Sequence, residues 1–181
     1  MIQVTNPADG SIVGQIPYLD SSEVASAINR TCDAFPVWSR RTAKERGDLL
    51  RRWYDLVRAD KQVFAELLVK ENGKCLSEAL GEIEYGLGFI KWYAEEARRL
   101  NGDTLPSHDP NASVLIVKEP VGPTAAITPW NFPFMMITRK IATALSAGCT
   151  MVNKPAEETP LTPYKLLEHA RLAGLSEGVF E

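Results

Sequence analysis

The alternation of apolar and polar positions divides the chain into two parts. In the first hundred residues, apolar side chains recur every three or four positions, which is the period of an amphipathic helix. Ahead of these helical positions, at the start of the chain, an Asp9-Gly10 turn separates two short apolar runs. It predicts a hairpin of Ile2–Val4 and Ser11–Ile16. The helical spacing predicts four helices, over Ser22 to about Trp38, Thr42 to about Asp60, Lys61–Glu71 and Ser77 to about Leu100.

After Val121 the pattern changes to strand, helix, strand, helix. Strands are predicted over Thr124–Thr128, which we expect to be buried, and over Thr150–Asn153, and helices over Pro133–Ala147 and Leu161–Leu172. This repeating order is typical of a parallel sheet with right-handed crossovers. The final Val179-Phe180 resembles the start of a third strand, so we expect the last unit to be cut there.

Two loops leave the carboxyl ends of the predicted strands, where open α/β sheets bind ligands. The first, Pro129–Pro133, places Asn131 between two prolines just before a helix. One interpretation is that Asn131 caps this helix through its side chain, with Pro133 at the first helical position. The other is that the prolines fix the backbone and leave the carboxamide N–H2 facing a reacting oxygen, where it would stabilise a developing negative charge.

The aromatic neighbours of Asn131 are open to two interpretations as well. Trp130 and Phe132 are either ordinary core residues or apolar walls that lower the local dielectric around a reaction. The loop has no GxGxxG pattern, so it cannot cradle a pyrophosphate in the manner of an ordinary dinucleotide fold.

The second loop begins Lys154-Pro-Ala-Glu157. Lys154 and Glu157 are either two solvated charges or a pair that binds ribose hydroxyls, and a carboxylate here would repel a 2′-phosphate and favour NAD over NADP. Arg139, roughly 9 Å along the helix from Pro133, is either exposed or ion-paired, or it clamps a substrate carboxylate with two hydrogen bonds.

Composition removes several classes of function. The 181 residues carry 20 basic and 23 acidic side chains, a net charge of −3, which gives no electrostatic case for nucleic acid or an anionic membrane as a partner. No apolar run is long enough to span a bilayer. Three scattered cysteines without a CxxC pattern, and only two histidines, favour a reduced, cytoplasmic protein without disulfides and argue against a metal site.

The motifs together resemble the aldehyde dehydrogenase superfamily. The resemblance rests on Thr128-Pro-Trp-Asn-Phe-Pro133, followed by Ala147-Gly-Cys-Thr150 and the Lys154–Glu157 motif. It extends over the whole chain, through Asn6–Gly10, Trp38, Glu71-Asn-Gly-Lys74 and Glu82. Met136–Lys140, Tyr93–Ala97 and Gly102–Thr104 are most similar to the succinate-semialdehyde dehydrogenase branch.

The resemblance implies a fold and an activity. The fold would be a truncated aldehyde dehydrogenase: residues 1–101 and 121–181 would form N-terminal helices and part of a parallel-sheet, Rossmann-like cofactor domain. Residues 102–120 would be the hairpin through which homodimers or homotetramers assemble. In the family, a cysteine thiolate attacks an aldehyde to give a thiohemiacetal, hydride passes to NAD or NADP, and water releases the acid.

Roles for this chain's residues follow from the same resemblance. Asn131 would be the side-chain oxyanion donor, and Arg139 would bind the distal carboxylate of the substrate, with Phe132 beside it. The cofactor would be bound by a set of residues from the two loops, namely Ile127, Thr128, Pro129, Trp130, Lys154 and Glu157. Glu157 stands where NADP-preferring relatives tend to have a smaller residue, so NAD is favoured and NADP stays possible.

The family's nucleophilic cysteine, catalytic glutamate and catalytic domain would lie beyond residue 181. Cys32 and Cys75 do not match the nucleophile, and we expect Cys149 to be a buried, unreactive thiol. We therefore expect the chain alone to be inactive, as the N-terminal part of an enzyme acting on succinate semialdehyde. Two alternatives remain: an enzyme for another aldehyde such as glutarate semialdehyde, and a non-catalytic nucleotide-binding or self-association fragment.

Overall fold

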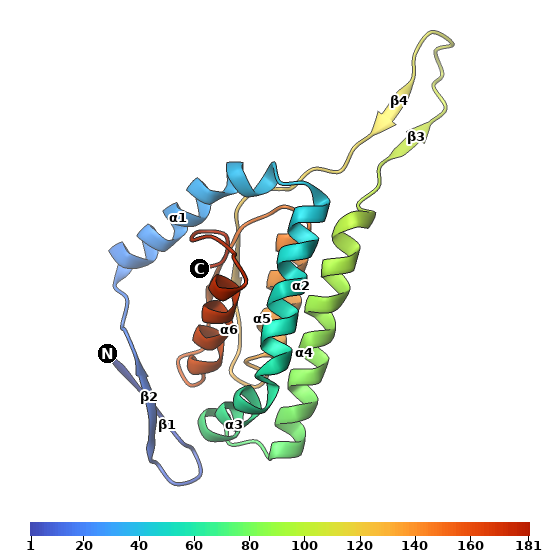
Figure 1. Ribbon diagram of the computed structural model, residues 1–181. Coiled ribbons are helices and arrows are strands. Elements are labelled where there is room, and N and C mark those ends of the chain that lie inside the picture. The colour runs from blue at the N-terminus through green and yellow to red at the C-terminus, as the bar shows by residue number, and fades with distance from the viewer.

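The computed structural model describes residues 1–181, and its helices and strands follow the predicted order (Figure 1). The α-helices are α1 (Ser21–Ser39), α2 (Ala43–Ala59), α3 (Lys61–Asn72), α4 (Leu76–Glu96), α5 (Met135–Ser146) and α6 (Leu161–Leu172). A short 3-10 turn, η1 (Ala97–Arg99), extends α4. The strands are β1 (Ile2–Thr5), β2 (Ile12–Ile16), β3 (Asp103–Leu105), β4 (Val114–Ile116), β5 (Thr124–Ile127) and β6 (Met151–Lys154). None of the helices combines the length and the apolar character that crossing a membrane requires.

Local sequence explains several helix ends. At the start of α2, the Thr42 and Glu45 side chains each accept a backbone N–H from the other residue, at 3.2 and 2.8 Å. This is a capping box, and it satisfies two of the donors that a helix start leaves unpaired. At the end of α3, Gly73 has φ of +80°, a left-handed conformation that other residues adopt only at a cost.

The strands form three separate pairs. β1 and β2 form the N-terminal antiparallel hairpin, and β5 pairs in parallel with β6, from Thr124 beside Met151 to Ile127 beside Lys154. Phe180 forms a further parallel bridge with Met151, so the predicted start of a third strand is confirmed. The prediction that the first strand is buried is wrong for much of β5, because Ile127 is 79% exposed and only Ala126 is buried.

One hydrophobic cluster joins the long helices to the β5–β6 pair. In Figure 1, α2, α4 and α5 run side by side, with α6 close to α2. The helices α4 and α5 pack closely at Gly86, where an added Cβ would lie 2.5 Å from the Phe134 ring just before α5 and 2.9 Å from Thr138 Oγ1. The buried indoles find partners in this core, since Trp38 donates to the Leu145 carbonyl at 3.2 Å and Trp53 to the Leu166 carbonyl at 3.1 Å.

The segment between the helical part and the β5–β6 pair projects away from the body as a hairpin (Figure 1). Its strands β3 and β4 are antiparallel, with Asp103 opposite Ile116. In the second arm of the hairpin, the regular pairing is limited to Val114–Ile116. The hairpin exposes a set of large apolar side chains: Leu105, Val114, Leu115, Ile116 and Val117.

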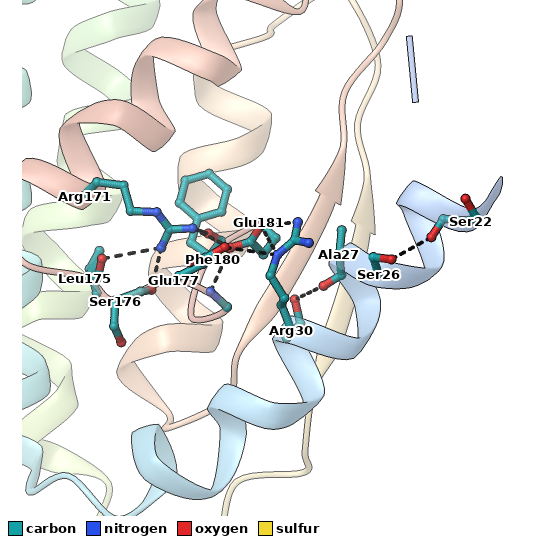
Figure 2. A network of polar contacts seen from close by, with 12 residues as sticks. Ser22, Ser26, Ala27, Arg30, Arg171, Leu175, Ser176, Glu177, Phe180 and Glu181 are labelled. Atoms are coloured by element: carbon teal, nitrogen blue, oxygen red, sulfur yellow. Dashed lines mark hydrogen bonds and ion pairs between the residues drawn. The ribbon is translucent and has the colours of Figure 1, made fainter. Parts of the chain in front are cut away.

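An ionic network holds the last residues against the helices (Figure 2). Arg30 of α1 and Arg171 of α6 both bind the Glu181 carboxylate, at 3.0 and 2.5 Å. The same carboxylate accepts the Gly178 N–H at 2.7 Å, and Arg171 also donates to the Phe180 carbonyl at 2.9 Å. These contacts keep Phe180 beside β6, where the third strand of the sheet begins.

Candidate active site

The two loops singled out in the sequence begin at neighbouring points on one edge of the β5–β6 pair. Ile127 and Lys154, the last residues of the two strands, lie opposite each other. The pairing continues one residue further, since the Thr128 N–H donates to the Lys154 carbonyl at 3.1 Å. Both loops therefore leave the carboxyl edge of the parallel pair side by side, as expected.

Asn131 does not cap the helix that follows it. The cap position of α5 is Phe134, which makes no side-chain capping bond, and α5 itself begins at Met135. Pro133 lies in a preceding turn, closed by the Met136 N–H donating to the Phe132 carbonyl at 3.0 Å. The capping interpretation of Asn131 is therefore wrong, as is the helix start at Pro133.

The Asn131 residue is exposed, and its carboxamide makes no hydrogen bond within the chain. Its backbone carbonyl, in contrast, accepts a hydrogen bond from Lys74 Nζ at 3.1 Å. Lys74 thus holds the backbone of the loop, and the side-chain amide of Asn131 stays available to a ligand. An N–H2 group carried on a backbone held in this way is a suitable donor to an oxygen that becomes negative, because the loop does not have to reorganise during a reaction.

The α5 helix start is capped from another part of the chain. Glu82 of α4 accepts the backbone N–H groups of Phe134 and Met135 on Oε1, at 2.9 and 3.0 Å. Its Oε2 binds Lys74 Nζ at 2.5 Å, and the Glu82 and Lys74 side chains are 1% and 10% exposed. A negative charge beside a helix N-terminus is stabilised by the helix dipole, so this carboxylate is well placed.

Sequence reasoning gave Glu82 and Lys74 no role of their own. A signal was present, because Glu82 lies at helical spacing with the buried residues Ala79, Ile83 and Gly86 on α4. A carboxylate on the apolar face of an amphipathic helix has to be paired or hydrogen-bonded. The position of Glu82 therefore predicts a buried polar contact, although not which groups take part.

The aromatic residues beside Asn131 are not core residues. Trp130 and Phe132 are 56% and 40% exposed, which contradicts the core-packing interpretation within this chain. Lys74 Nζ lies 4.7 Å from the centre of the Phe132 ring, and Asn72 donates to the Trp130 carbonyl at 2.9 Å. Both residues are therefore tied to the end of α3 and the residues just after it.

The second loop carries an exposed ion pair between Lys154 and Glu157. The hydrogen bond from Lys154 lowers the pKa of Glu157, so this carboxyl is ionised at neutral pH. The loop ends at α6, where the Leu161 and Thr162 N–H groups both donate to Glu71 at 2.9 Å. The pKa of Glu71 is raised above its ordinary value because burial disfavours the charged form.

Arg139 lies on the exposed side of α5, with its guanidinium carbon 5.4 Å from the centre of the Phe89 ring on α4. It has no ion-pair partner in the chain, so of the two alternatives to a substrate clamp, the exposed arginine is the one the structure supports. Phe89 in turn lines an open depression of about 640 Å³ on α4, which sequence reasoning missed. The other residues lining it are Gly81, Glu84, Tyr85, Gly88, Trp92 and Tyr93.

Cys149, as predicted, is buried, while Cys32 and Cys75 are exposed and lie outside both loops. The Cys149 side chain belongs to the hydrophobic cluster. The described contacts give none of the three thiols a histidine or carboxylate partner. They thus lack the neighbouring base that usually activates a nucleophilic cysteine.

Comparison with known proteins gives consistent results. The model of the aldehyde dehydrogenase family matches residues 1–181. The chain is 50% identical over 179 residues to a glutarate-semialdehyde dehydrogenase of Pseudomonas aeruginosa, covering 99% of this chain and 37% of that protein. It is 49% identical over 179 residues to a succinate-semialdehyde dehydrogenase of Escherichia coli whose name specifies NADP(+), again with 99% and 37% coverage.

The fold has close solved counterparts. An aldehyde dehydrogenase from Brucella melitensis biovar abortus 2308 superimposes with a TM-score of 0.97 at 49% identity, covering 99% of this chain and 37% of that one. The expected α/β fold is thereby confirmed. The chain spans little more than a third of the length of the relatives it matches.

Proposed function

Because the chain belongs to the aldehyde dehydrogenase family, we propose that it is the N-terminal part of an enzyme that oxidises a short semialdehyde acid with a nicotinamide cofactor. The observation that supports this most directly is the Asn131 carboxamide. It extends without a hydrogen-bond partner in the chain from a loop at the sheet edge whose backbone is held by Asn72 and Lys74. An amide held in this way suits the oxyanion that forms when a nucleophile adds to an aldehyde.

In this proposal the cofactor is bound by the edge of the β5–β6 pair. The cofactor side would be lined by the stretch from Ile127 to Trp130, in which Ile127 and Trp130 are exposed and Thr128 is buried. The adenosine ribose would be bound by Lys154 and Glu157. The exposed, ionised Glu157 fits a ribose diol, because a carboxylate accepts hydrogen bonds from both hydroxyls and repels a 2′-phosphate. When bound, the nicotinamide would accept hydride from the substrate. NAD is favoured on this argument, although a relative at 49% identity is named for NADP(+).

The substrate would lie along the α4–α5 surface. Arg139 has no carboxylate partner within the chain, and it stands over Phe89 at the side of the open depression on α4. A guanidinium without a partner can bind a substrate carboxylate through two parallel hydrogen bonds. Phe132 and Phe89 would cover the methylene groups between this carboxylate and the aldehyde. Succinate semialdehyde is favoured, and glutarate semialdehyde is the alternative.

In this proposal the nucleophilic cysteine and the catalytic domain belong to the part of the enzyme outside this chain. None of its three cysteines has the surroundings of a nucleophile, so the chain alone would bind and orient but would not oxidise an aldehyde. Residues 1–101 and 121–181 would supply part of the cofactor domain, and the exposed hairpin within residues 102–120 would join copies into dimers or tetramers.

The test is Asn131→Ala in a full-length enzyme carrying this chain. Loss of one oxyanion donor lowers kcat by about 10²- to 10³-fold, and we expect this loss with little change in KM. Arg139→Ala is the matching test of the substrate. Hydrogen bonds to charged groups contribute about 1.5–3 kcal/mol, so kcat/KM should fall about 10- to 150-fold for succinate semialdehyde. It should change little for an uncharged aldehyde of similar length.

The neighbouring exposed Lys140 provides the control for the arginine, because Lys140→Ala removes a positive charge from the same helix. Equal losses on both aldehydes for Arg139→Ala would remove this residue from substrate selection. An Asn131→Ala enzyme with unchanged kcat would contradict the proposed role of the carboxamide.

A further inference from the structure

Four backbone groups of the Asn131 loop and the following turn are held by side chains from outside the loop. The carbonyls of Trp130 and Asn131 accept from Asn72 and Lys74, at 2.9 and 3.1 Å. The N–H groups of Phe134 and Met135 donate to Glu82 at 2.9 and 3.0 Å. The holding side chains come from the α3–α4 junction and from α4, more than 50 residues away in sequence.

The Lys74–Glu82 pair is an expensive way to stabilise a fold. Both side chains are almost fully buried, and removing two charges from water costs several kcal/mol for each ion before their attraction is counted. A buried pair is therefore weak evidence for stability, and its best-attested use is to fix one arrangement among alternatives. Here the hydrogen bonds of the pair beyond its own salt bridge all go to the Asn131 loop and the start of α5.

The geometry shows what the pair fixes. Lys74 holds the carbonyl of Asn131 itself, and its ammonium also lies 4.7 Å from the centre of the Phe132 ring. Glu82 holds the first turn of α5 and orients Lys74 through its second oxygen. The peptide units on either side of the carboxamide are thus fixed, and with them the direction in which the Asn131 side chain leaves the backbone.

We propose that Lys74, oriented by Glu82 and assisted by Asn72, is a positioning residue that sets the direction of the Asn131 carboxamide toward the reacting oxygen. This inference rests on the proposed function of Asn131. It assigns Lys74 no contact with substrate or cofactor. A displacement of about 1 Å in a catalytic group can reduce the rate by about a hundredfold, so a loss of this order is within the reach of a positioning contact.

The experiment is a double-mutant cycle in a full-length enzyme that carries this chain, with Lys74→Met, Asn131→Ala and the two combined. Lys74→Met alone should lower kcat and kcat/KM equally, by about 10- to 100-fold, because the lost interaction is made in the transition state. In the Asn131→Ala background the same substitution should cost less than about twofold, since the group it positions is gone. Lys61→Met is the control: this lysine pairs with Glu84 at 3.7 Å in an exposed bridge, and kcat should stay within about twofold.

Two further measurements keep the test decisive if Lys74→Met fails to fold. Urea unfolding of each variant separates loss of structure from loss of rate. Asn72→Ala removes the contact to the Trp130 carbonyl, which is made at an exposed site, and it should show the same dependence on Asn131 with a smaller loss.

The outcomes separate the two ideas. If Asn131→Ala leaves kcat unchanged, the proposed function of Asn131 fails and this inference fails with it. If Asn131→Ala is impaired but Lys74→Met costs the same factor in both backgrounds, or costs nothing in either, only the positioning role is overturned. A loss of rate that disappears in the Asn131→Ala background supports it, because a merely structural lysine would cost the same in both backgrounds.

Discussion

Replacing Gly86 or Gly88 of α4 by alanine should change stability in opposite directions. A Cβ at Gly86 would lie 2.5 Å from two carbons of the Phe134 ring and 2.9 Å from Thr138 Oγ1. Phe134 is fully buried and also packs edge-on against Phe64, with ring centroids 5.4 Å apart, so its ring has nowhere to move. At Gly88, two residues later on the same helix, no atom lies within 4 Å of the added Cβ.

The magnitudes follow from two opposing terms. Alanine in place of glycine inside a helix stabilises by about 0.5–1 kcal/mol, because the unfolded chain loses freedom. Overpacking a core costs about 1–3 kcal/mol, and contacts below 3 Å against rigid neighbours place Gly86 at the upper end. Gly86→Ala should therefore be less stable by about 2 kcal/mol, and Gly88→Ala more stable by about 0.5–1 kcal/mol.

Urea unfolding followed by tryptophan fluorescence measures both variants, since Trp38 and Trp53 are buried in the same core. The urea concentration at the unfolding midpoint should fall for Gly86→Ala and rise for Gly88→Ala, and the dependence of the unfolding free energy on urea concentration should stay the same. If Gly86→Ala were as stable as Gly88→Ala, the close contact between α4 and α5 would be wrong. The position of α5 and of the loop before it would then need another explanation.

Three further predictions concern the second loop and the hairpin. Burial raises the pKa of Glu71 above its ordinary value of 4.5, so the folded state holds this proton more tightly, and the stability contribution falls as pH rises from 4.5 through the raised pKa. Relative to Glu71→Gln, the original protein should lose stability as pH rises from 4.5 to 7 in urea unfolding. The control variant Glu66→Gln, at an exposed site of α3, keeps Glu71 and should retain this trend. Glu157→Ser should lower KM for NADP at least about tenfold relative to KM for NAD, because the charge that repels a 2′-phosphate is removed; an unchanged ratio of the two KM values would exclude Glu157 from cofactor choice. Leu115→Asp, on the exposed hairpin, should shift the full-length enzyme to smaller oligomers in sedimentation velocity, and an unaltered distribution would remove the hairpin from assembly.

Local pattern was enough to predict most of the elements. Amphipathic spacing gave the order of the helices and placed the start of α2 within a residue of Thr42. The strand–helix repeat gave the parallel pairing of β5 and β6, including the bridge at Phe180. These features depend on neighbours within a few residues or on the alternation of whole elements, and both can be read along the chain.

The start of α5 could not be predicted in the same way. Local sequence offered Asn131 as the cap and Pro133 as the first helical residue, whereas the cap comes from Glu82, 52 residues earlier. A capping rule considers only nearby side chains, and a tertiary contact overrides it here. The exposure of Ile127 was missed for a related reason. An apolar strand indicates burial, but the sequence does not show which face of the strand the rest of this chain covers.

The geometry of both loops depends on the Glu71–Lys74 turn, which comprises the last two residues of α3 and the first two residues after it. Glu71 caps α6 after the second loop, while Asn72 and Lys74 hold the first loop. Gly73 makes this possible because its left-handed backbone, with φ of +80°, turns the chain between these side chains, and an added Cβ would lie 2.7 Å from Pro7. A parallel strand pair alone fixes where the two loops begin, but it does not fix the backbone conformation of the loops. The Glu71–Lys74 turn supplies the missing constraint, so any change that moves α3 against α4 should disturb both loops together.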